Sequence, residues 1–469
     1  MTRRPKIKLP HTLALVYIMV VLTAAATWIV PGGKYQRVEK EGRQVPVAGT
    51  FSLTERNPQG LGALFVSPVK GFIDAAAIIA IVFVVGGAFA VIQKTGAVTG
   101  FIHNVAVRFG ESRALRALLI PVTMLIFSLG GAVFGMCEET MPFVLIFVPL
   151  ALSLGYDSIV GVALPFVGAA AGFAGAFFNP FTVGIAQGIA GLPIYSGIGY
   201  RLVIWAIGTA IAIILVMRYA SRVLRNPRLS PTYEDDLERR KSLSLDVAPS
   251  QAVCLTPAHK RVLFAFLLGM GLLVFGILHY KWYIQEIAGL FLGLGILSGF
   301  LGGLRTEEIS RSFVDGAKDM INAALIIGCA RAILVVATDG RILDTTLFYL
   351  SKAIAGFHPV LSAQLMFASQ CVINFFVHSG TAQAALTMPI MTPLGELVGI
   401  TRQTSVFAFQ LAEYINPILP TSGVTMGVLG LARLRWEKWA RWMVPLVIAW
   451  VLFALLSLIP PVLMRWGPF

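Results

Sequence analysis

The sequence has few charged residues for its length. Aspartate, glutamate, lysine and arginine make up 13% of its 469 residues, whereas hydrophobic residues make up 57%. A soluble globular chain carries roughly 25% charged residues, so this chain has too little charge to cover a fold in water. A lipid bilayer is the solvent that accepts such an apolar surface. The composition therefore predicts a membrane protein.

Cysteine and histidine are also scarce, which argues against several kinds of site. The cysteines lack the CxxC spacing of a metal site: Cys137, Cys254, Cys329 and Cys371. None of the six histidines belongs to an HExxH motif, and no GK[ST] follows a glycine-rich segment. We expect no catalytic residues, no cofactor and no nucleotide site. The only ions expected are Na⁺ or H⁺, as coupling ions.

Positive charge is plentiful, with a net charge of +14, but it occurs in short clusters between apolar runs. Such clusters are typical of cytoplasmic anchors under the positive-inside rule. The cluster that begins at Arg3 predicts a cytoplasmic N-terminus and places 31–70 outside. A nucleic-acid surface would need a soluble domain, which the sequence lacks, so we expect no nucleic-acid partner. The first apolar run is too long for a signal-peptide core and predicts an uncleaved helix.

Long apolar runs recur along the chain, and each membrane crossing needs about 20 residues. They lie near 11–30, 72–92, 114–134, 157–178, 199–219, 260–278, 283–301, 317–338, 360–377 and 442–464. Other apolar stretches are broken by glycine, proline and polar residues: 137–155, 179–193, 379–399 and 416–431. Broken backbone survives in lipid only where protein or a water-filled cavity satisfies it. We therefore predict an all-α polytopic membrane protein with re-entrant hairpins or discontinuous helices.

The two halves of the chain share landmarks in the same order. The segments GIAQGIAGL (184–192) and GVTMGVLGL (423–431) share GxxxGxxGL, and each follows an Asn-Pro pair. Upstream, EETMP precedes the first pair and QAALTMP the second, and GFID and GAKD come earlier still. The order predicts two structurally repeated halves, 1–219 and 260–469, and we expect inverted repeats. The polar stretch 220–259 is predicted to be a cytoplasmic linker.

Interrupted helices in repeated halves are the sequence signature of a transporter's binding site. Several strings carry a more specific likeness: GMCEETMPF (135–143), GAAAGFAGAFFNPFTVGIAQGIAGLP (168–193), SGTAQAALTMPIMTPL (379–394), VGITRQ (398–403) and PTSGVTMGVLGL (420–431). They resemble the YfcC-like branch of the DcuC (C4-dicarboxylate anaerobic carrier) family, in the ion transporter superfamily.

The resemblance implies a scaffold domain, a mobile transport domain with re-entrant hairpins, an elevator motion and a homodimer in the bacterial inner membrane. The branch is linked to C4-dicarboxylates by name and also to exchange of basic amino acids. One departure concerns the substrate. Where a Gly-Asp-Gly-like stretch is expected before the second break, this sequence has Ala412, Glu413 and Tyr414. The acid is kept but lengthened, and an aromatic residue replaces a glycine.

Adjacent carboxylates at Glu138 and Glu139, followed by Thr140, interrupt an apolar stretch. An ionisable group at membrane depth costs at least about 2.5 kcal/mol, so we expect it to meet a cation, a proton, an ammonium or a guanidinium. Neighbouring helix positions point about 100° apart, so at most one of the two should face the site. The alternative is a hydrated hairpin at the membrane interface.

The matching segment of the second half is neutral and comprises Ser379, Gly380, Thr381 and Gln383. Its hydroxyl and amide oxygens suit Na⁺, since hard cations favour oxygen ligands, and its donors suit a substrate carboxylate. The alternative is ordinary packing of small polar residues between membrane helices.

Asn179 and Asn416 stand at the two expected helix breaks. The proline that follows each removes an N–H and disfavours helix at the asparagine. Their amides can donate to and accept from a zwitterion or an ion. Weaker binding candidates near the breaks are Thr182, Gln187, Thr421 and Ser422. The coupling-ion candidates are Glu139, Asn179, Ser379, Glu413 and Asn416.

Arg331 is an isolated charge in the apolar run 320–337. It could hold a substrate carboxylate with its bidentate fork, or it could neutralise an acid within the scaffold, which we favour. Asp74 and Asp319 are expected to begin their helices, where a carboxylate stabilises the N-terminus.

These observations predict a secondary active transporter that moves a small organic ion, driven by an ion gradient or by exchange. The carboxylates at 138–139 favour a substrate with a cationic group, so an amino acid, above all a basic one, ranks first. The alternative is a C4-dicarboxylate carrier with Na⁺ or H⁺ coupling or antiport. A channel is a distant alternative, because the broken helices and the repeat argue against it.

Overall fold

The computed structural model describes residues 12–40, 43–101, 104, 113–242, 255–280, 282, 284–354 and 356–467. Within them the chain is mainly helical, with two small antiparallel sheets of two strands each. Strand β1 (Gly33–Lys34) pairs with β4 (Ser52–Leu53), and β2 (Arg37–Lys40) with β3 (Arg43–Pro46). The basic residues before position 12, which support the expected cytoplasmic N-terminus, and Cys254 lie outside the described residues.

In the described part of the chain, 7 helices are long and apolar enough to cross a membrane. They are α1 (Thr12–Ile29), α3 (Ala76–Lys94), α10 (Ile198–Arg225), α13 (Ile284–Leu301), α15 (Ile321–Asp339), α17 (Pro359–Phe376) and α21 with α22 (Trp436–Leu463). Each matches an apolar run that the sequence predicted to span. The chain is therefore a multi-pass α-helical membrane protein.

Some expected spans are divided or shortened. The run 157–178 forms α7 (Ser158–Val162), a π-helical turn η1 (Ala163–Val167) and α8 (Gly168–Ala174), and it leaves helical geometry before position 179. The runs that begin near 72 and 317 continue helices that start earlier. These are α2 (Leu61–Asp74), which precedes α3, and α14 (Thr306–Lys318), which precedes α15.

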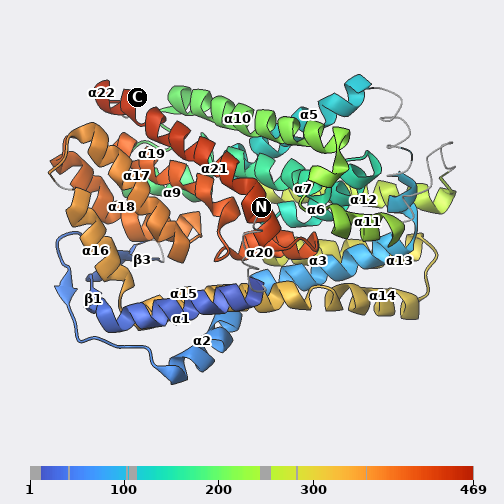
Figure 1. Ribbon diagram of the computed structural model, residues 1–469, viewed down its shortest axis with the longest axis horizontal. Coiled ribbons are helices and arrows are strands. Elements are labelled where there is room, and N and C mark those ends of the chain that lie inside the picture. The colour runs from blue at the N-terminus through green and yellow to red at the C-terminus, as the bar shows by residue number, and fades with distance from the viewer. Residues whose placement is uncertain are drawn as a thin grey trace, which may run out of the picture.

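The helix pairs α2–α3 and α14–α15 pack against each other in opposite directions. A Cβ atom at Gly71 would collide with the carbonyl oxygen of Gly328. Further along, a Cβ at Gly316 would lie 2.5 Å from the carbonyl oxygen of Gly86. The two helix pairs therefore run antiparallel to each other. The small residues at the contacts let the backbones approach closely. Helices α1, α15 and α14 run along one edge of the molecule (Figure 1).

The junctions within these helix pairs carry ion pairs. Asp74 is the last residue of α2 and pairs with Arg331 of α15, whereas Asp319 follows α14 and pairs with Arg433. Of the two roles predicted for Arg331, the internal ion pair is the one for which the structure shows a partner. The expectation that Asp74 and Asp319 only serve a helix N-terminus is wrong, because each also ends a helix and bonds an arginine.

A second group of helices contains the interrupted segments. It comprises α5 (Arg113–Phe134), α6 (Thr140–Ser153), α8, η2 (Pro180–Gly184), α9 (Ile185–Ile189), α18 (Gly380–Leu397), α19 (Arg402–Leu411), η4 (Ala412–Ile418) and α20 (Gly423–Leu431). Helices α5 and α8 are in backbone contact, since a Cβ at Gly172 would meet the carbonyl of Ser128. This close packing places the end of α5 beside the end of α8.

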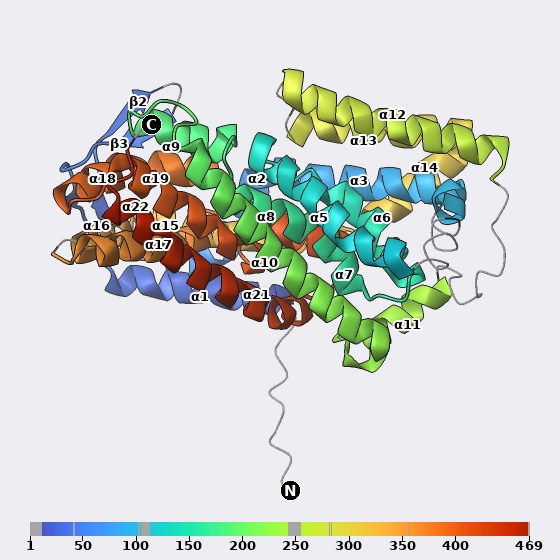
Figure 2. The same cartoon turned by 90° about the horizontal axis from the view of Figure 1, so that it is seen from above.

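The polar stretch 220–259 contains regular structure where it is described. Helix α10 continues to Arg225, and η3 (Pro227–Leu229) and α11 (Tyr233–Ser242) follow, before α12 (Pro257–Tyr280). Asp236 of α11 accepts a hydrogen bond from the backbone N–H of Ser158 at 3.0 Å. Helix α11 thus packs on the turn between α6 and α7. Helices α12 and α13 lie together along another edge of the molecule (Figure 2). The remaining helix, α16 (Leu343–Ile354), precedes α17.

Candidate substrate site

The interruptions of the two halves occur in matching places. The first tip, residues 135–139, connects α5 to α6, and the first break, residues 175–179, connects α8 to η2. The second tip, residues 377–379, connects α17 to α18, and the second break, residues 412–422, includes η4 and leads to α20. A helix therefore begins after every one of these interruptions, at Thr140, Pro180, Gly380 and Gly423.

Direct contacts bring the tips and breaks together. A Cβ at Gly135, in the first tip, would lie 2.7 Å from Oδ1 of Asn179 in the first break. In the second half, the Asn416 side chain donates from Nδ2 to the carbonyl of His378 at 3.1 Å. Thr381, just after the second tip, donates from Oγ1 to the carbonyl of Phe181 at 2.9 Å. Each tip therefore meets the break of its own half, and the second tip also reaches the first half.

Local chemistry explains where the helices restart. Asn179 is extended (φ −62°, ψ 114°), and its Oδ1 accepts hydrogen bonds from the backbone N–H groups of Phe181 at 2.8 Å and Thr182 at 3.3 Å. Pro180 takes the first helical position, where its missing N–H is no loss. In the second half, Ser422 Oγ accepts from the N–H of Thr425 at 3.3 Å and starts α20. Asn179 therefore works first as a helix cap.

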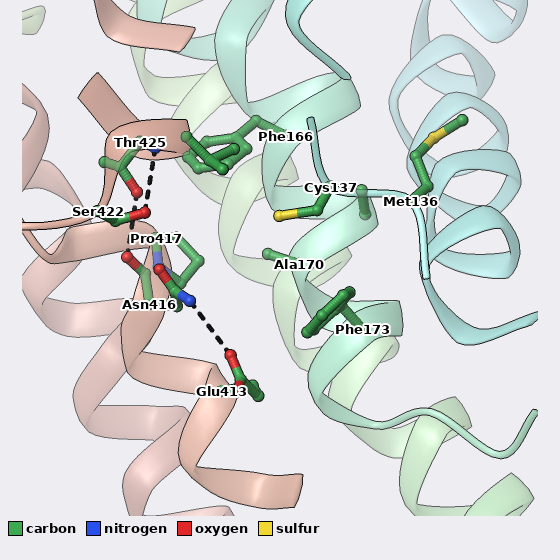
Figure 3. Close-up of a pocket in the computed structure, with 12 residues that line it drawn as sticks. Met136, Cys137, Phe166, Ala170, Phe173, Glu413, Asn416, Pro417, Ser422 and Thr425 are labelled. Atoms are coloured by element: carbon green, nitrogen blue, oxygen red, sulfur yellow. Dashed lines mark hydrogen bonds between the residues drawn. The ribbon is translucent and has the colours of Figure 1, made fainter. Parts of the chain in front are cut away.

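A narrow pocket lies between the first tip, α8 and the second break (Figure 3). Its lining residues are Met136, Cys137, Phe166, Ala169, Ala170, Phe173, Glu413, Asn416, Pro417, Ser422, Val424 and Thr425. The polar atoms come mainly from the second break, and the opposite wall is formed by Phe166, Ala170 and Phe173. The pocket thus has one polar and one apolar side.

Glu413 is the acidic residue in this lining, and the lining contains no lysine or arginine. Its side chain is buried, with 2% of the residue surface exposed. Oε2 accepts a hydrogen bond from Asn416 Nδ2 at 3.2 Å, whereas Oε1 has no hydrogen-bond partner among the described residues. A buried carboxylate oxygen without a donor is expensive, so the site is suited to a ligand that supplies donors or positive charge.

Other buried polar atoms near the breaks also lack partners in the described ranges. They are Asn179 Nδ2, Thr182 Oγ1 and Thr421 Oγ1. Gly380 lies close to two of the groups at the site: a Cβ there would be 2.5 Å from Thr182 Cγ2 and 3.3 Å from Glu413 Oε1. The absence of a side chain at position 380 therefore lets the start of α18 fit between the first and second breaks.

The carboxylates predicted as the sharpest feature lie beside the pocket rather than in its lining. Glu139 is buried and its Oε2 accepts a hydrogen bond from the N–H of Cys137 at 2.8 Å. Thr140 Oγ1 donates to the carbonyl of Cys137 at 2.6 Å. Glu138 is half-buried and also lies outside the lining. The first tip thus uses its polar side chains to close its own loop.

The remaining predicted residues divide between the site and its supports. Asn416 and Ser422 line the pocket, whereas Ser379 is exposed. Gln383 donates from Nε2 to the carbonyl and to Oε1 of Gln370, both at 2.9 Å, and so joins α18 to α17. Gln187 donates to Gln403 Oε1 at 3.0 Å and belongs to a separate polar cluster.

Sequence reasoning did not single out several residues that line the pocket. Cys137 and Met136 stand in the first tip string GMCEE, and Thr425 stands in the GVTMG string after the second break. These three residues lie within motifs already recognised as unusual, and their place in those motifs was the sequence feature that could have pointed to them. Nothing in the sequence pattern distinguished Phe166 and Phe173 from other aromatic residues of an apolar helix.

With this geometry established, comparison with known proteins decides the family. The family model of the C4-dicarboxylate anaerobic carriers, DcuC, matches residues 9–462. The chain belongs to this family. It is a membrane transporter, and the resemblance found from the sequence motifs is confirmed.

Relatives extend the likeness to individual proteins. A protein of Escherichia coli K12 with the provisional name basic amino acid antiporter YfcC is 35% identical over 474 residues, which cover 92% of each chain. An uncharacterised protein of Haemophilus influenzae is 27% identical over 484 residues, covering 93% of this chain and 94% of that protein.

Solved structures of transporters are more distant. The YdaH transporter of Alcanivorax borkumensis has a TM-score of 0.43 and 16% identity, with 98% of this chain and 100% of that chain covered. MtrF of Neisseria gonorrhoeae has a TM-score of 0.40 and 17% identity, with 96% and 95% covered. TM-scores below 0.5 do not establish a shared fold.

Proposed function

We propose that this transporter is a secondary active carrier of an amino acid with a cationic side chain, which it moves by exchange or by coupling to an ion gradient. The single observation that carries the proposal is Glu413, a buried pocket carboxylate whose Oε1 has no partner in the described chain. An ammonium or guanidinium group supplies both the charge and the N–H donors that this oxygen lacks.

The helix N-termini at the site suit the other end of such a substrate. Helices α6, η2–α9, α18 and α20 begin at the tips and breaks that meet there. The first N–H groups of a helix have no partner within it and favour negative charge. An amino acid's α-carboxylate can therefore be held by backbone N–H groups and by Asn179 Nδ2, without an arginine.

A dicarboxylate fits this pocket less well. It would bring two negative charges next to Glu413, and no basic residue lines the pocket. Arg331, the candidate for binding a carboxylate, already pairs with Asp74. The provisional name of the relative YfcC agrees with a basic amino acid, whereas the family description refers to C4-dicarboxylates.

The alternative retains the family's named substrate. Na⁺ bound by Glu413 and neighbouring carbonyl or hydroxyl oxygens would neutralise the pocket and allow a dicarboxylate to bind beside it. Asn416, which contacts both Glu413 and the second tip, would then be a ligand or a support of the ion site. Hard cations favour such oxygen ligands.

The proposed motion is an elevator movement of the interrupted helices against α2–α3 and α14–α15, in a homodimer. The antiparallel packing of α2–α3 on α14–α15 supports an inverted relation of the two halves, because GFID ends α2 and GAKD lies at the end of α14. Pocket residues come from the first tip, η1 and α8 in the first half and from the second break and α20 in the second half, and these elements would move together as one transport domain.

The test is uptake into proteoliposomes loaded with unlabelled amino acid or with buffer alone. Labelled arginine and labelled succinate are compared with and without a sodium gradient. The proposal expects saturable arginine uptake that increases when the lumen contains a basic amino acid. Sodium-driven succinate uptake without arginine uptake would support the alternative, and uptake that does not saturate would indicate a channel.

A further inference from the structure

Arg201 is a buried charge outside the substrate site. It lies in the first turns of α10, and none of its surface is exposed (0%). Its Nε, Nη1 and Nη2 atoms are all buried without a hydrogen-bond partner in the part of the chain that the structure describes. A buried charge is stable only when a partner compensates it. The guanidinium therefore marks a place where an anion is needed.

Aromatic rings flank this guanidinium. Its Cζ atom lies 5.6 Å from the ring centroid of Phe407 in α19 and 5.6 Å from that of Trp466, which follows α22 (Ile459–Leu463). The two rings are themselves in edge contact, with centroids 5.7 Å apart. Ring faces attract a cation, but they leave its charge uncompensated and its N–H groups without strong acceptors.

Polar side chains next to Arg201 offer donors rather than charge. A Cβ at Gly197, one turn before Arg201, would lie 2.5 Å from Gln403 Nε2 and would also meet the Trp466 ring. Ser196 Oγ accepts hydrogen bonds from Gln403 Nε2 at 3.0 Å and from Gln187 Nε2 at 3.2 Å. Because Ser196 Oγ accepts both of these bonds, its hydroxyl hydrogen remains available to donate to another acceptor. No carboxylate forms an ion pair with Arg201 among the described residues.

We propose that Arg201 binds a small monovalent anion of the size of chloride, at a site separate from the substrate pocket. A halide accepts N–H bonds from the guanidinium, neutralises it and needs little space. The complete burial of Arg201 disfavours a larger organic acid. Seating the ion beside the guanidinium requires the Trp466 ring to shift, and Trp466 lies in the coil after α22 rather than in a helix.

The site has a structural consequence. It lies where α10, α19, α9 and the segment after α22 meet, at one end of the molecule (Figure 2). A bound halide would join these elements, so the stability of the folded chain should depend on halide concentration. A ligand that binds only the native state raises its apparent stability.

The first test compares the thermal unfolding of the purified full-length chain in sodium chloride, sodium bromide and sodium gluconate at equal ionic strength. Chloride and bromide should raise the apparent unfolding temperature in a saturable way, by on the order of 3 °C, whereas gluconate should not. Equal unfolding temperatures in all three salts would overturn the proposal. Sodium acetate and sodium succinate are measured in the same way, and stabilisation by either of them but not by the halides would also overturn the proposal, because the occupant would then be a carboxylate.

The second test uses variants. Arg201→Gln should lose the halide dependence, whereas Arg402→Gln, a neighbouring arginine that already pairs with Glu396, should keep it. If Arg201→Gln does not fold, Arg201→Lys keeps the charge but loses the planar fork. It should then need a roughly tenfold higher chloride concentration for the same shift. Halide dependence that is unchanged in the Arg201 variant would assign the effect to another part of the surface.

Discussion

The two halves of the chain use their buried carboxylates in different ways. In the first half, Glu139 accepts an N–H of its own tip and stands outside the pocket. In the second half, Glu413 lines the pocket and keeps Oε1 without a partner in the described ranges. Both residues are almost fully buried, at 5% and 2% exposed. The two carboxylates therefore differ in their hydrogen bonding rather than in their burial, and this difference underlies the proposal that Glu413 is the one that binds substrate.

The largest effect is expected from Glu413→Gln. Removing the charge that pairs with a substrate cation in a buried site costs about 2 to 5 kcal/mol, so arginine uptake should fall on the order of 100-fold. Proteoliposome uptake measures this. The matched control is Glu396→Gln, whose exposed carboxylate pairs with Arg402 and which should transport normally. Normal uptake by Glu413→Gln would remove the distinction between the two carboxylates.

A smaller loss is expected from Gly380→Ala. The new methyl group would stand 2.5 Å from Thr182 Cγ2 and 3.3 Å from Glu413 Oε1, so either the start of α18 or the Thr182 side chain must shift. Overpacking of this kind costs about 1 to 3 kcal/mol, and uptake should fall on the order of tenfold. Gly199→Ala is the control, because a Cβ there meets nothing within 4 Å. Equal uptake by both variants would mean that the second tip does not fit closely between the breaks.

Glu139→Gln should affect folding more than transport. The glutamine still offers one carbonyl oxygen to the Cys137 N–H, but the charge-assisted bond is lost, at about 1 to 2 kcal/mol. We expect a lower unfolding temperature and an uptake reduced by about threefold. Thermal unfolding and uptake are measured on the same preparation. A loss as large as that of Glu413→Gln would place Glu139 in the substrate site after all.

The smallest effect on transport is expected at the Asp74–Arg331 pair, which joins α2 to α15 and contributes no residue to the pocket lining. Arg331→Gln leaves Asp74 without its partner and should lower the unfolding temperature, and the double change with Asp74→Asn should recover part of the loss. Uptake should stay within about twofold of normal. If arginine uptake were abolished while stability recovered, Arg331 would have a role in transport.

Much of the architecture follows from local sequence features. The apolar runs predict the long helices because each must satisfy its backbone within itself in lipid. Each Asn-Pro pair predicts a helix restart at its proline. Asn179 does cap a helix that begins at Pro180, but Pro417 lies inside η4 and the new helix starts only at Gly423. The difference arises because Ser422, rather than Asn416, provides the cap of α20.

The site was predictable only in outline. The tips and breaks were recognised because charge, proline and glycine interrupt apolar segments. Which side chains face the pocket was not predictable, since Cys137 and Glu413 are far apart in the chain and meet only through the packing of α5 on α8 and of the second tip on the first break. Arg201 gave no signal, because one arginine near a helix end usually reaches the membrane surface.

The sequence by itself determined that the chain is a membrane protein with interrupted helices, and its motifs pointed to the family; the repeat of the two halves stays a prediction from the order of the motifs. Hydropathy and the conformational limits of proline act locally, so their effects can be predicted without knowing which residues contact each other. Only the tertiary structure decided that Glu139 closes its own tip, that Arg331 belongs to Asp74, and that Glu413 opens into the pocket. The assignments of Arg331 and Glu413 depend on which groups from distant parts of the chain meet, and packing alone settles that.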